Sequence, residues 1–410
     1  MSLIVQKYGG TSVADAGRIQ NVAQRVASRH RGGDRLVVVV SAMGDTTDQL
    51  VELARQISEQ PEARELDLLL STGETVSMTL LAMALHAQGI DAVSLSGAQA
   101  GLRTDTEHGR ARILAVETER IQRELDQGRV VIVAGFQGIT AELDVTTFGR
   151  GGSDITPVAL AAALGAERCE IYTDVDGVYT TDPRVEPAAR TLRDISYEEM
   201  LELAAVGAKV LHPRAVELGA VYNIPIVVAS SFNQKPGTLI HGGVNMEEFN
   251  KVRGIAHDQD VAKVTVRGVP DQPGIAATIF EPLAEHHISV DTIVQNTSVE
   301  QIADVTFTLS GDDLEKAVPI VERVAKEIKA AEVVADDGLG KVSIVGTGMQ
   351  SAPGYAARMF RALCDADVNI DIISTGEIRI TCIIRRPDVE KAVRALHAAF
   401  ELEKAEAGEL

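Results

Sequence analysis

A lysine and two adjacent glycines follow the first apolar run of the chain, in the stretch VQKYGGTS. Glycines at the end of a strand let backbone N–H groups approach an anion closely, and the ammonium of Lys7 would meet the same anion. Thr11 and Ser12 add hydroxyl groups beside Gly9 and Gly10. The alternative is an ordinary glycine turn with a solvated lysine. The chain contains neither a Walker A string nor G-x-G-x-x-G, so the two usual nucleotide-binding motifs are absent.

A second glycine cluster, FGRGGSD, also combines a cation with exposed backbone amides. The guanidinium of Arg150 can grip a carboxylate with two parallel hydrogen bonds. The amides of Gly151, Gly152 and Ser153 can surround another anion at the start of a helix. The alternative is a helix-capping loop in which Ser153 or Asp154 is the cap.

The stretch YTDVDGVYTTDPR is rich in carboxylates and hydroxyls. A calcium loop is excluded, because Val178 and Val185 stand where such a loop requires oxygen ligands. The chemistry of a tight turn explains the pair Asp176-Gly177.

Two shorter stretches admit plain structural interpretations. STGE, which ends at Glu74, fits a capping box that opens a helix. In GAKVLHP, Lys209 fits a surface lysine and His212 a residue at a helix end.

Short apolar runs alternate with helical stretches over residues 1–243, the predicted first domain. Strands that are apolar on both faces, separated by helices, predict a three-layer α/β domain with a mostly parallel sheet. Because both glycine loops follow strands, we expect them to face one crevice at the carboxyl ends of the sheet. The expected strands are 3–6, 36–40, 92–95, 130–134, 170–172 and 224–228, and the expected helices are 21–29, 75–87, 110–126, 157–164 and 197–203.

Beyond residue 243 the chain repeats itself. Pro273-Gly274 is matched by Pro353-Gly354, and Asp291 by Asp371, in both cases 80 residues on. Each copy reads as strand, turn, helix, strand, strand and helix, and the first copy ends with a further strand at residues 332–335. The second copy lacks its last strand, so we expect residues 252–257, ahead of the first copy, to complete it. The predicted modules are therefore 262–338, and 250–258 together with 340–405.

The Pro-Gly turn of each module could bind a small amino acid. Its N–H groups can donate hydrogen bonds to a carboxylate, and Asp271 beside the first turn could pair with an ammonium. The alternative is a plain helix start that was duplicated with the module. Ser351 stands in the second copy where Asp271 stands in the first, so the two sites should differ.

Composition excludes several classes of function. The net charge of −20 gives no surface on which a nucleic acid would release counterions. The three cysteines, Cys169, Cys364 and Cys382, show neither metal-ligand spacing nor a paired framework, which fits a reducing cytoplasm. No signal peptide or membrane anchor is expected, because the longest apolar runs, such as 130–136, are too short to span.

Five of these stretches, together with a sixth at residues 39–50, resemble the amino acid kinase family, and within it the aspartate kinases. KYGGTS, VVSAMGDTTDQL, STGE, FGRGGSD, YTDVDGVYTTDPR and GAKVLHP stand in that family's order. The two repeats resemble the paired ferredoxin-like βαββαβ ACT modules that follow the kinase domain in the family. No homoserine dehydrogenase half follows, so the resemblance is to the monofunctional form.

The resemblance implies roles for individual residues. Lys7 and Asp154 would be the catalytic pair. ATP, with Mg²⁺ carried on its phosphates and no metal site in the protein, would contact Lys7, Gly9, Gly10, Ser41, Thr173, Asp174, Tyr179, Arg184 and Lys209. Aspartate would contact Thr47, Glu74, Arg150, Gly151, Gly152 and Ser153. Effectors such as lysine or threonine would contact Asp271, Gly274, Ile275, Ala276, Val290, Asp291, Gln295, Asn369, Ile370 and Thr375.

The resemblance also implies an assembly. ACT modules commonly pair across subunits, so a homodimer or an α2β2 tetramer is expected. In some relatives a shorter subunit starts internally, near the position of Met246.

The implied reaction is phosphorylation of the side-chain carboxylate of aspartate, a first step toward lysine, threonine and methionine. That carboxylate is ionised at neutral pH, so it needs no general base. The obstacle is repulsion between two anions, which Lys7, loop amides and Mg²⁺ would neutralise. Asp154 would then orient Lys7 or contact the metal shell. A glutamate or acetylglutamate kinase is the enzymatic alternative, and a non-catalytic amino-acid sensor is the alternative of another class.

Overall fold

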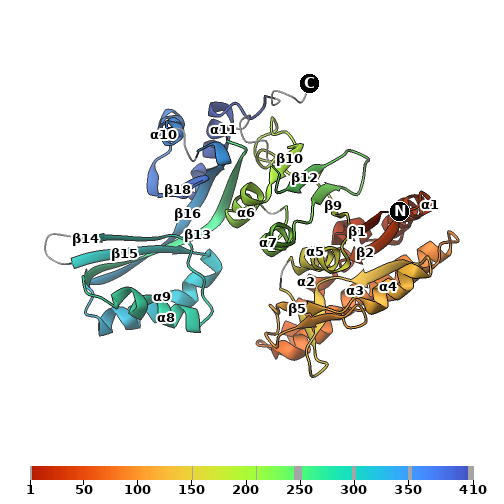
Figure 1. The fold of residues 1–410 in the computed structure, drawn as a ribbon. Helices are drawn as coiled ribbons and strands as arrows, with labels where there is room; N and C mark the ends of the chain where they lie inside the picture. The colour runs from red at the N-terminus through yellow and green to blue at the C-terminus, as the bar shows by residue number, and fades with distance from the viewer. Residues whose placement is uncertain are drawn as a thin grey trace. The chain divides into compact units, whose positions relative to one another are not determined.

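The computed structural model describes residues 2–149, 151–208, 210–243, 252–297, 302–349 and 353–404. The chain forms two compact units (Figure 1). The first consists of residues 1–179, 191–205 and 209–246, and the second of residues 180–190, 206–208 and 247–410. Two short segments that the sequence-based limits assign to the first domain, 180–190 and 206–208, therefore lie in the second unit.

The first unit contains an eight-stranded sheet in the order β10-β12-β11-β9-β1-β2-β6-β3, and a four-stranded sheet in the order β5-β4-β7-β8. Its strands are β1 (Leu3–Tyr8), β2 (Arg35–Val40), β3 (Ala92–Leu95), β4 (Leu102–Thr104), β5 (Ile113–Val116), β6 (Val130–Ala134), β7 (Gln137–Ile139), β8 (Val145–Thr147), β9 (Arg168–Thr173), β10 (Asp194–Ser196), β11 (Ile226–Ser230) and β12 (Thr238–His241). Its helices are α1 (Ala16–Arg31), α2 (Thr46–Ile57), α3 (Ala63–His86), α4 (Glu119–Asp126), α5 (Ile155–Leu164), α6 (Tyr197–Ala205) and α7 (Pro213–Tyr222).

The large sheet is parallel apart from the pairing of β11 with β12, which agrees with the expected fold class. Its central strands are buried on both faces. In β2, Leu36, Val38 and Val40 join the cluster formed with α1 and α3. The alternate residues Val37 and Val39 are equally inaccessible to solvent. This double burial explains why these strands read as continuous apolar runs.

Two helix predictions are wrong in part. Residues 113–116 of the expected helix 110–126 form β5 instead, because the small sheet gives this segment a strand partner in β4. STGE does not open a helix, because α3 already begins at Ala63 with Glu62 as its N-cap. Ser71 lies inside α3 and donates its hydroxyl to the carbonyl of Leu68 at 2.8 Å.

Helix α3 is the core helix of this unit. It is long and apolar enough to cross a bilayer, the one such helix in the described ranges, but 50% of its most apolar window is buried within the protein. Met78, Leu81 and Leu85 pack into the cluster against α1 and the sheet. The helix also buries two carboxylates, Asp67 and Glu74, which a bilayer would penalise.

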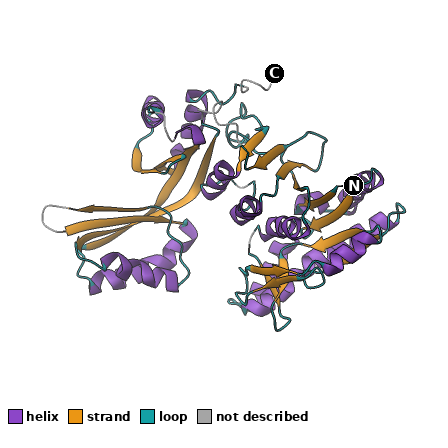
Figure 2. Cartoon of the chain, in the orientation of Figure 1, coloured by secondary structure: helices purple, strands orange, loops and turns teal. Residues whose placement is uncertain are grey.

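The second unit is built on one six-stranded sheet in the order β14-β15-β13-β16-β18-β17. Its strands are β13 (Gly254–Pro270), β14 (Ile293–Thr297), β15 (Ile302–Leu309), β16 (Glu332–Val345), β17 (Ile370–Thr375) and β18 (Arg379–Arg385). Its helices are α8 (Ile275–Glu285), α9 (Gly311–Glu327), α10 (Tyr355–Asp365) and α11 (Val389–Ala399). Figure 2 shows α8 with α9, and α10 with α11, as two separate helix pairs beside this sheet.

Each of the two long strands, β13 and β16, contributes one half to the sheet of each repeat. Residues 254–258 of β13 pair with 341–345 of β16, and residues 263–267 pair with 332–336. The expected contribution of residues 252–257 to the sheet of the second repeat is therefore present, beginning at Gly254. Each repeat keeps its own core, one under α8 and α9 and the other under α10 and α11.

Candidate active site

The carboxyl ends of four adjacent parallel strands meet at one edge of the large sheet. Backbone hydrogen bonds join the residues that follow these strands: Gly9 N–H to Tyr172 O at 3.0 Å, Ser41 N–H to Tyr8 O at 3.1 Å, and Gly135 N–H to Val40 O at 3.0 Å. In the sheet, β2 and β6 lie on one side of β1, and β9, which comes later in the chain, lies on the other side. Such a reversal of strand order is where open α/β sheets bind ligands.

Lys7 and Asp154 form a buried ion pair at this edge. Lys7 lies in β1, and Asp154 ends the short turn Gly152–Asp154 that precedes α5. The Lys7 Nζ lies 2.7 Å from Asp154 Oδ1. Only 7% of Lys7 and 8% of Asp154 is exposed. A buried ammonium with one carboxylate partner keeps two N–H donors for an anionic ligand.

His212 lies beside the same carboxylate, as the N-cap of α7. Its backbone N–H donates to Asp154 Oδ2 at 3.4 Å, and its Nδ1 accepts from the backbone N–H of Arg214 at 3.1 Å. Burial lowers the pKa of His212, in opposition to the attraction of Asp154. The prediction that His212 sits at a helix end is confirmed.

Gly9 and Gly10 differ in what a side chain would meet. A methyl group on Gly9 would lie 3.7 Å from Lys7 Nζ, and its φ of −68° suits any residue. A methyl group on Gly10 would lie 3.0 Å from the carbonyl oxygen of Ala42 and 3.1 Å from that of Gly44. Gly9 therefore keeps space open beside the ammonium, whereas Gly10 lets two backbone segments pack together.

This difference predicts separable effects of two alanine substitutions. Gly10→Ala should lower the free energy of unfolding by about 1–3 kcal/mol, because backbone must move to admit the methyl group. Gly9→Ala should leave the melting temperature unchanged but raise the KM for ATP about tenfold, because the methyl group occupies the approach to Lys7. Calorimetry and initial rates measure both. A melting temperature that falls equally in the two variants would contradict this assignment.

Glu74 is a second buried carboxylate close to the strand ends. It is 3% exposed, and its Oε1 accepts from the backbone N–H of Ala42 at 3.1 Å. Among the residues that the structure describes, its Oε2 has no hydrogen-bond partner. Burial raises the pKa of Glu74 to about 7, while the N–H of Ala42 and the charge of Lys7 oppose that rise. A buried oxygen without a partner is a candidate to accept a hydrogen bond from a cationic ligand.

The loop FGRGGSD is closely packed on both sides of residue 150. A methyl group on Gly151 would lie 2.8 Å from the His212 ring, and one on Gly152 would lie 2.6 Å from the Phe148 side chain. A methyl group on Gly135, which follows β6, would lie 3.4 Å from the Cβ of Ser153. Ser153 therefore lies at the end of β6.

Arg150 and Lys209 lie outside the described residues. Thr47 is half-buried in the first turn of α2.

The end of β9 carries the residues expected at ATP. Thr173 donates its hydroxyl to Asp174 Oδ1 at 3.1 Å, and the Thr173 carbonyl accepts from Ser231 N–H at 2.9 Å. Tyr179, half-buried, follows in the same unit, and burial raises its pKa. Arg184 belongs to the second unit, where its guanidinium pairs with Asp182 at 2.8 Å.

Three polar residues after β11 join this strand end, and the sequence interpretation missed them. Ser231 accepts from the Ser12 hydroxyl at 2.8 Å. Asn233 donates to Asp176 Oδ1 at 2.7 Å, and Lys235 Nζ lies 2.5 Å from Asp176 Oδ2. Lys235 holds the pKa of Asp176 below its usual value. The available signal was the polar stretch SSFNQK directly after an apolar strand.

The residues expected at an effector lie at the turns and outer strands of the second unit. Gly274 and Gly354 cap α8 and α10 with φ values of 94° and 110°, which confirms that the repeated turn is a repeated helix start. Asp271, Ala276, Gln295, Asn369 and Thr375 are exposed, whereas Ile275, Val290 and Ile370 are half-buried. Ser351 lies outside the described residues.

Asp291 is already paired across the two repeats. Its carboxylate lies 2.9 Å from Lys341 Nζ, a buried lysine of β16. The equivalent pair joins Lys263 of β13 to Asp371 of β17. These reciprocal ion pairs link each repeat to the other.

Comparison with known proteins places the chain in a family. Its sequence matches the amino acid kinase family over residues 2–230 and the ACT domain twice, over 264–326 and 342–400. It is 52% identical to an aspartate kinase of Stutzerimonas stutzeri over 406 residues, or 98% of each chain. It is also similar to E. coli aspartokinase III in complex with aspartate and ADP, with 29% identity, a TM-score of 0.83, and coverage of 97% of this chain and 100% of the other.

A second complex of E. coli aspartokinase III, with lysine and aspartate, gives a TM-score of 0.74 at 29% identity, with coverage of 97% and 99%. The chain therefore belongs to the amino acid kinase family, and within that family to the aspartate kinases with two ACT domains. The resemblance, fold class and enzyme class expected from the sequence are thereby confirmed.

Proposed function

We propose that the first unit transfers the γ-phosphoryl group of ATP to the side-chain carboxylate of L-aspartate, giving 4-phospho-L-aspartate, with Lys7 and Asp154 as the catalytic pair. The observation that carries this assignment is the buried ammonium of Lys7, 2.7 Å from Asp154, at the shared end of β1, β2, β6 and β9.

Charge neutralisation is the principal task of this site. Two unit charges about 4 Å apart repel by roughly 4 kcal/mol at the effective dielectric of a protein surface. Lys7 and the amides after β1 would lie between the phosphates and the attacking carboxylate. Asp154 orients Lys7, because its carboxylate contacts that ammonium and the substrate needs no proton acceptor. The site would thus accelerate transfer by position and electrostatics.

Mg²⁺ would be carried by the phosphate oxygens of ATP rather than by a dedicated protein site. The described residues contain no group of three or more His, Cys, Asp or Glu side chains that could hold a metal ion. When bound, the ion would supply further positive charge on the transferring group. Gly9, Gly10, Ser41, Thr173, Asp174, Tyr179 and Lys209 are the residues of the first unit that we propose for the nucleotide.

Aspartate would be held between α3 and the FGRGGSD loop. Glu74 Oε2, which has no partner among the described residues, would accept a hydrogen bond from the substrate ammonium. Arg150 would grip the α-carboxylate, with Ser153 and the amides of Gly151 and Gly152 beside it, and Thr47 would approach from α2.

Formation of the acyl phosphate tests the proposed reaction. The purified chain, ATP and Mg²⁺ are incubated with aspartate, glutamate or acetylglutamate, and the product is trapped with hydroxylamine. Aspartate should give hydroxamate at least ten times faster than the other acids, because a site built around paired charges rejects a displaced or acetylated amine. Faster hydroxamate formation from glutamate or acetylglutamate would overturn the substrate assignment. If no acid gave hydroxamate, the alternative of a non-catalytic amino-acid sensor would be favoured.

The second unit would bind lysine or threonine at the residues expected for an effector, and the chain would respond with a coupling of about 1–3 kcal/mol between the two sites. We propose domain limits of 1–243 for the kinase, 262–338 for the first ACT module, and 250–258 with 340–405 for the second, with the difference that segments 180–190 and 206–208 belong to the second compact unit. Inhibition by lysine or threonine in the hydroxamate assay would identify the effector.

The proposal also covers the oligomeric state of the protein and its location in the cell. β14 and β17 are the outer strands of the six-stranded sheet, and Ile293 and Ile373 on them are about half exposed, as expected of edges that pair with another subunit. We therefore propose a homodimer or α2β2 tetramer. The free cysteines fit a cytoplasmic location.

A further inference from the structure

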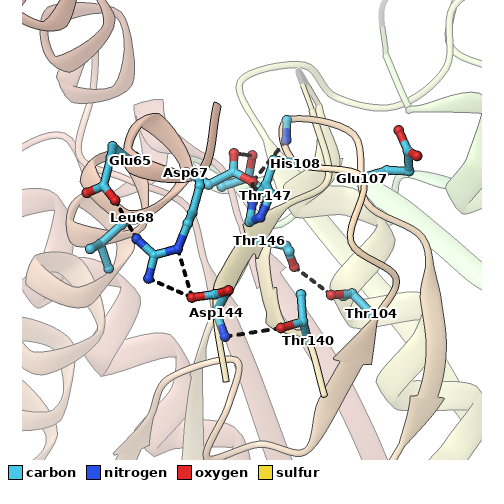
Figure 3. Close-up of polar contacts among 12 residues, drawn as sticks. Glu65, Asp67, Leu68, Thr104, Glu107, His108, Thr140, Asp144, Thr146 and Thr147 are labelled. Carbon is cyan, nitrogen blue, oxygen red and sulfur yellow. Dashed lines mark hydrogen bonds and ion pairs between the residues drawn. The ribbon is translucent and has the colours of Figure 1, made fainter. Parts of the chain in front are cut away.

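Asp67 is a buried carboxylate that contacts neither Lys7 nor Glu74. It lies in the first turns of α3 and is 1% exposed. Its Oδ2 accepts from Thr147 N–H at 3.0 Å and from Gly109 N–H at 2.9 Å, and lies 3.0 Å from His108 Nδ1. Its Oδ1 accepts from the Thr147 hydroxyl at 2.5 Å. Figure 3 shows Asp67 pointing from α3 toward Thr147 and His108.

These contacts hold the start of the FGRGGSD loop. Thr147 ends β8 and directly precedes Phe148, the first residue of that loop. The Thr147 carbonyl also accepts from Ala111 N–H at 2.8 Å, so a second loop, residues 107–112, lies behind the first. A methyl group on Gly149 would lie 3.0 Å from the carbonyl of Gly109, which shows how closely the two loops pack.

Asp67 and Glu74 share one helix. They stand seven residues apart, which places them on the same face of α3, about 10.5 Å apart along its axis. One rigid helix therefore presents the carboxylate proposed for the substrate ammonium and anchors the loop proposed for the substrate carboxylate.

We propose that Asp67 is a positioning residue for aspartate binding, acting through Thr147 on the loop that carries Arg150 and Ser153. This rests on the proposed role of that loop. Asp67 does not touch substrate. Without its carboxylate, the N–H groups of Thr147 and Gly109 are buried without a partner, and the loop start is free to move.

The test first compares two Asp67 variants of the full chain with the wild type. Asp67→Ala should raise the KM for aspartate about tenfold or more, with the KM for ATP changed less than about twofold. Asp67→Asn should restore the aspartate KM to within about threefold of the wild type, because its amide oxygen can accept from both N–H groups while its NH₂ donates to the Thr147 hydroxyl. A purely structural role would change both KM values together.

Asp144→Ala is the matched control. Asp144 pairs with Arg64 and follows β7 in the same small sheet, on the side of Thr140 (Figure 3). Its removal should leave both KM values within about twofold. If Asp67→Ala does not fold, Thr147→Val tests the same inference. This variant removes only the hydrogen bond from the Thr147 hydroxyl to Asp67, and it should raise the KM for aspartate about threefold. Unchanged aspartate KM in a folded Asp67→Ala, or in Thr147→Val, would overturn the inference.

Arg150→Ala separates this inference from the proposed function. A large rise in the aspartate KM for Arg150→Ala, with none for Asp67→Ala, refutes the role of Asp67 and leaves the loop assignment in place. If the KM for aspartate rises in neither variant, the proposed role of the FGRGGSD loop in binding aspartate is itself refuted.

Discussion

Replacing Lys7 with alanine should lower kcat about a thousandfold while the KM for ATP rises less than about tenfold. The ammonium is buried at the strand ends, and it would lie between two anions that repel by roughly 4 kcal/mol without it. Three decades in rate correspond to about that free energy. The adenine and ribose would still be bound by the residues around β9, so nucleotide affinity should fall less. Steady-state rates with saturating aspartate measure both parameters.

Lys7→Arg and Asp154→Asn are informative controls for this variant. Arginine keeps the charge but not the compact geometry, so it should recover part of the loss. Asp154→Asn keeps a polar partner for the ammonium but removes its counter-charge, and we expect a smaller fall in kcat than in Lys7→Ala. Turnover of Lys7→Ala within tenfold of the wild type would refute the proposed mechanism.

The kcat/KM for aspartate should depend on pH through the protonation of Glu74. Burial raises the pKa of this carboxyl to about 7, so below that pH it is protonated and neutral and does not pair with the substrate ammonium. The value of kcat/KM for aspartate should therefore rise about tenfold per unit up to about pH 7 and be level above it. The pH dependence of kcat/KM reports the free enzyme. Initial rates at low aspartate between pH 5.5 and 9 would give this profile.

Glu74→Gln should remove this acid limb. At pH 8 it should also lower kcat/KM for aspartate about 30- to 150-fold, the equivalent of about 2–3 kcal/mol for a hydrogen bond to a charged group. The neighbouring Thr75→Ala, on the same helix, should keep the wild-type profile. An unchanged acid limb in Glu74→Gln would show that another group titrates.

The sequence predicts the strand ends well because the chemistry lies in contiguous motifs. Lys7 lies near the end of β1 and Gly9 follows it, in a parallel sheet that brings such strand ends to one edge. The loop with Asp154 follows β8 of the small sheet instead, and the ion pair of Asp154 with Lys7 brings it to the same edge. The shared sheet of the repeats was predictable for a similar reason, since the second repeat has one strand too few and a spare segment stands before the first.

Features that depend on tertiary pairing were missed. β4, β5, β7 and β8 have only three or four residues each, too few to show a periodicity, and only their mutual pairing makes them strands. STGE imitates a capping box, but the apolar residues before it extend α3 toward its true start at Ala63. Asp67 likewise shows no local signal, because its partners lie at residues 108, 109 and 147.

The rate of the chemical step in Lys7→Ala tests the central claim most directly. Enzyme in excess over radiolabelled ATP is mixed with saturating aspartate and quenched on a millisecond scale, so that product release does not limit the signal. If the buried ammonium bridges the two anions, transfer to aspartate in the variant should be about a thousandfold slower than in the wild type while ATP remains bound. A variant that transfers phosphate at the wild-type rate would show that Lys7 does not perform this role.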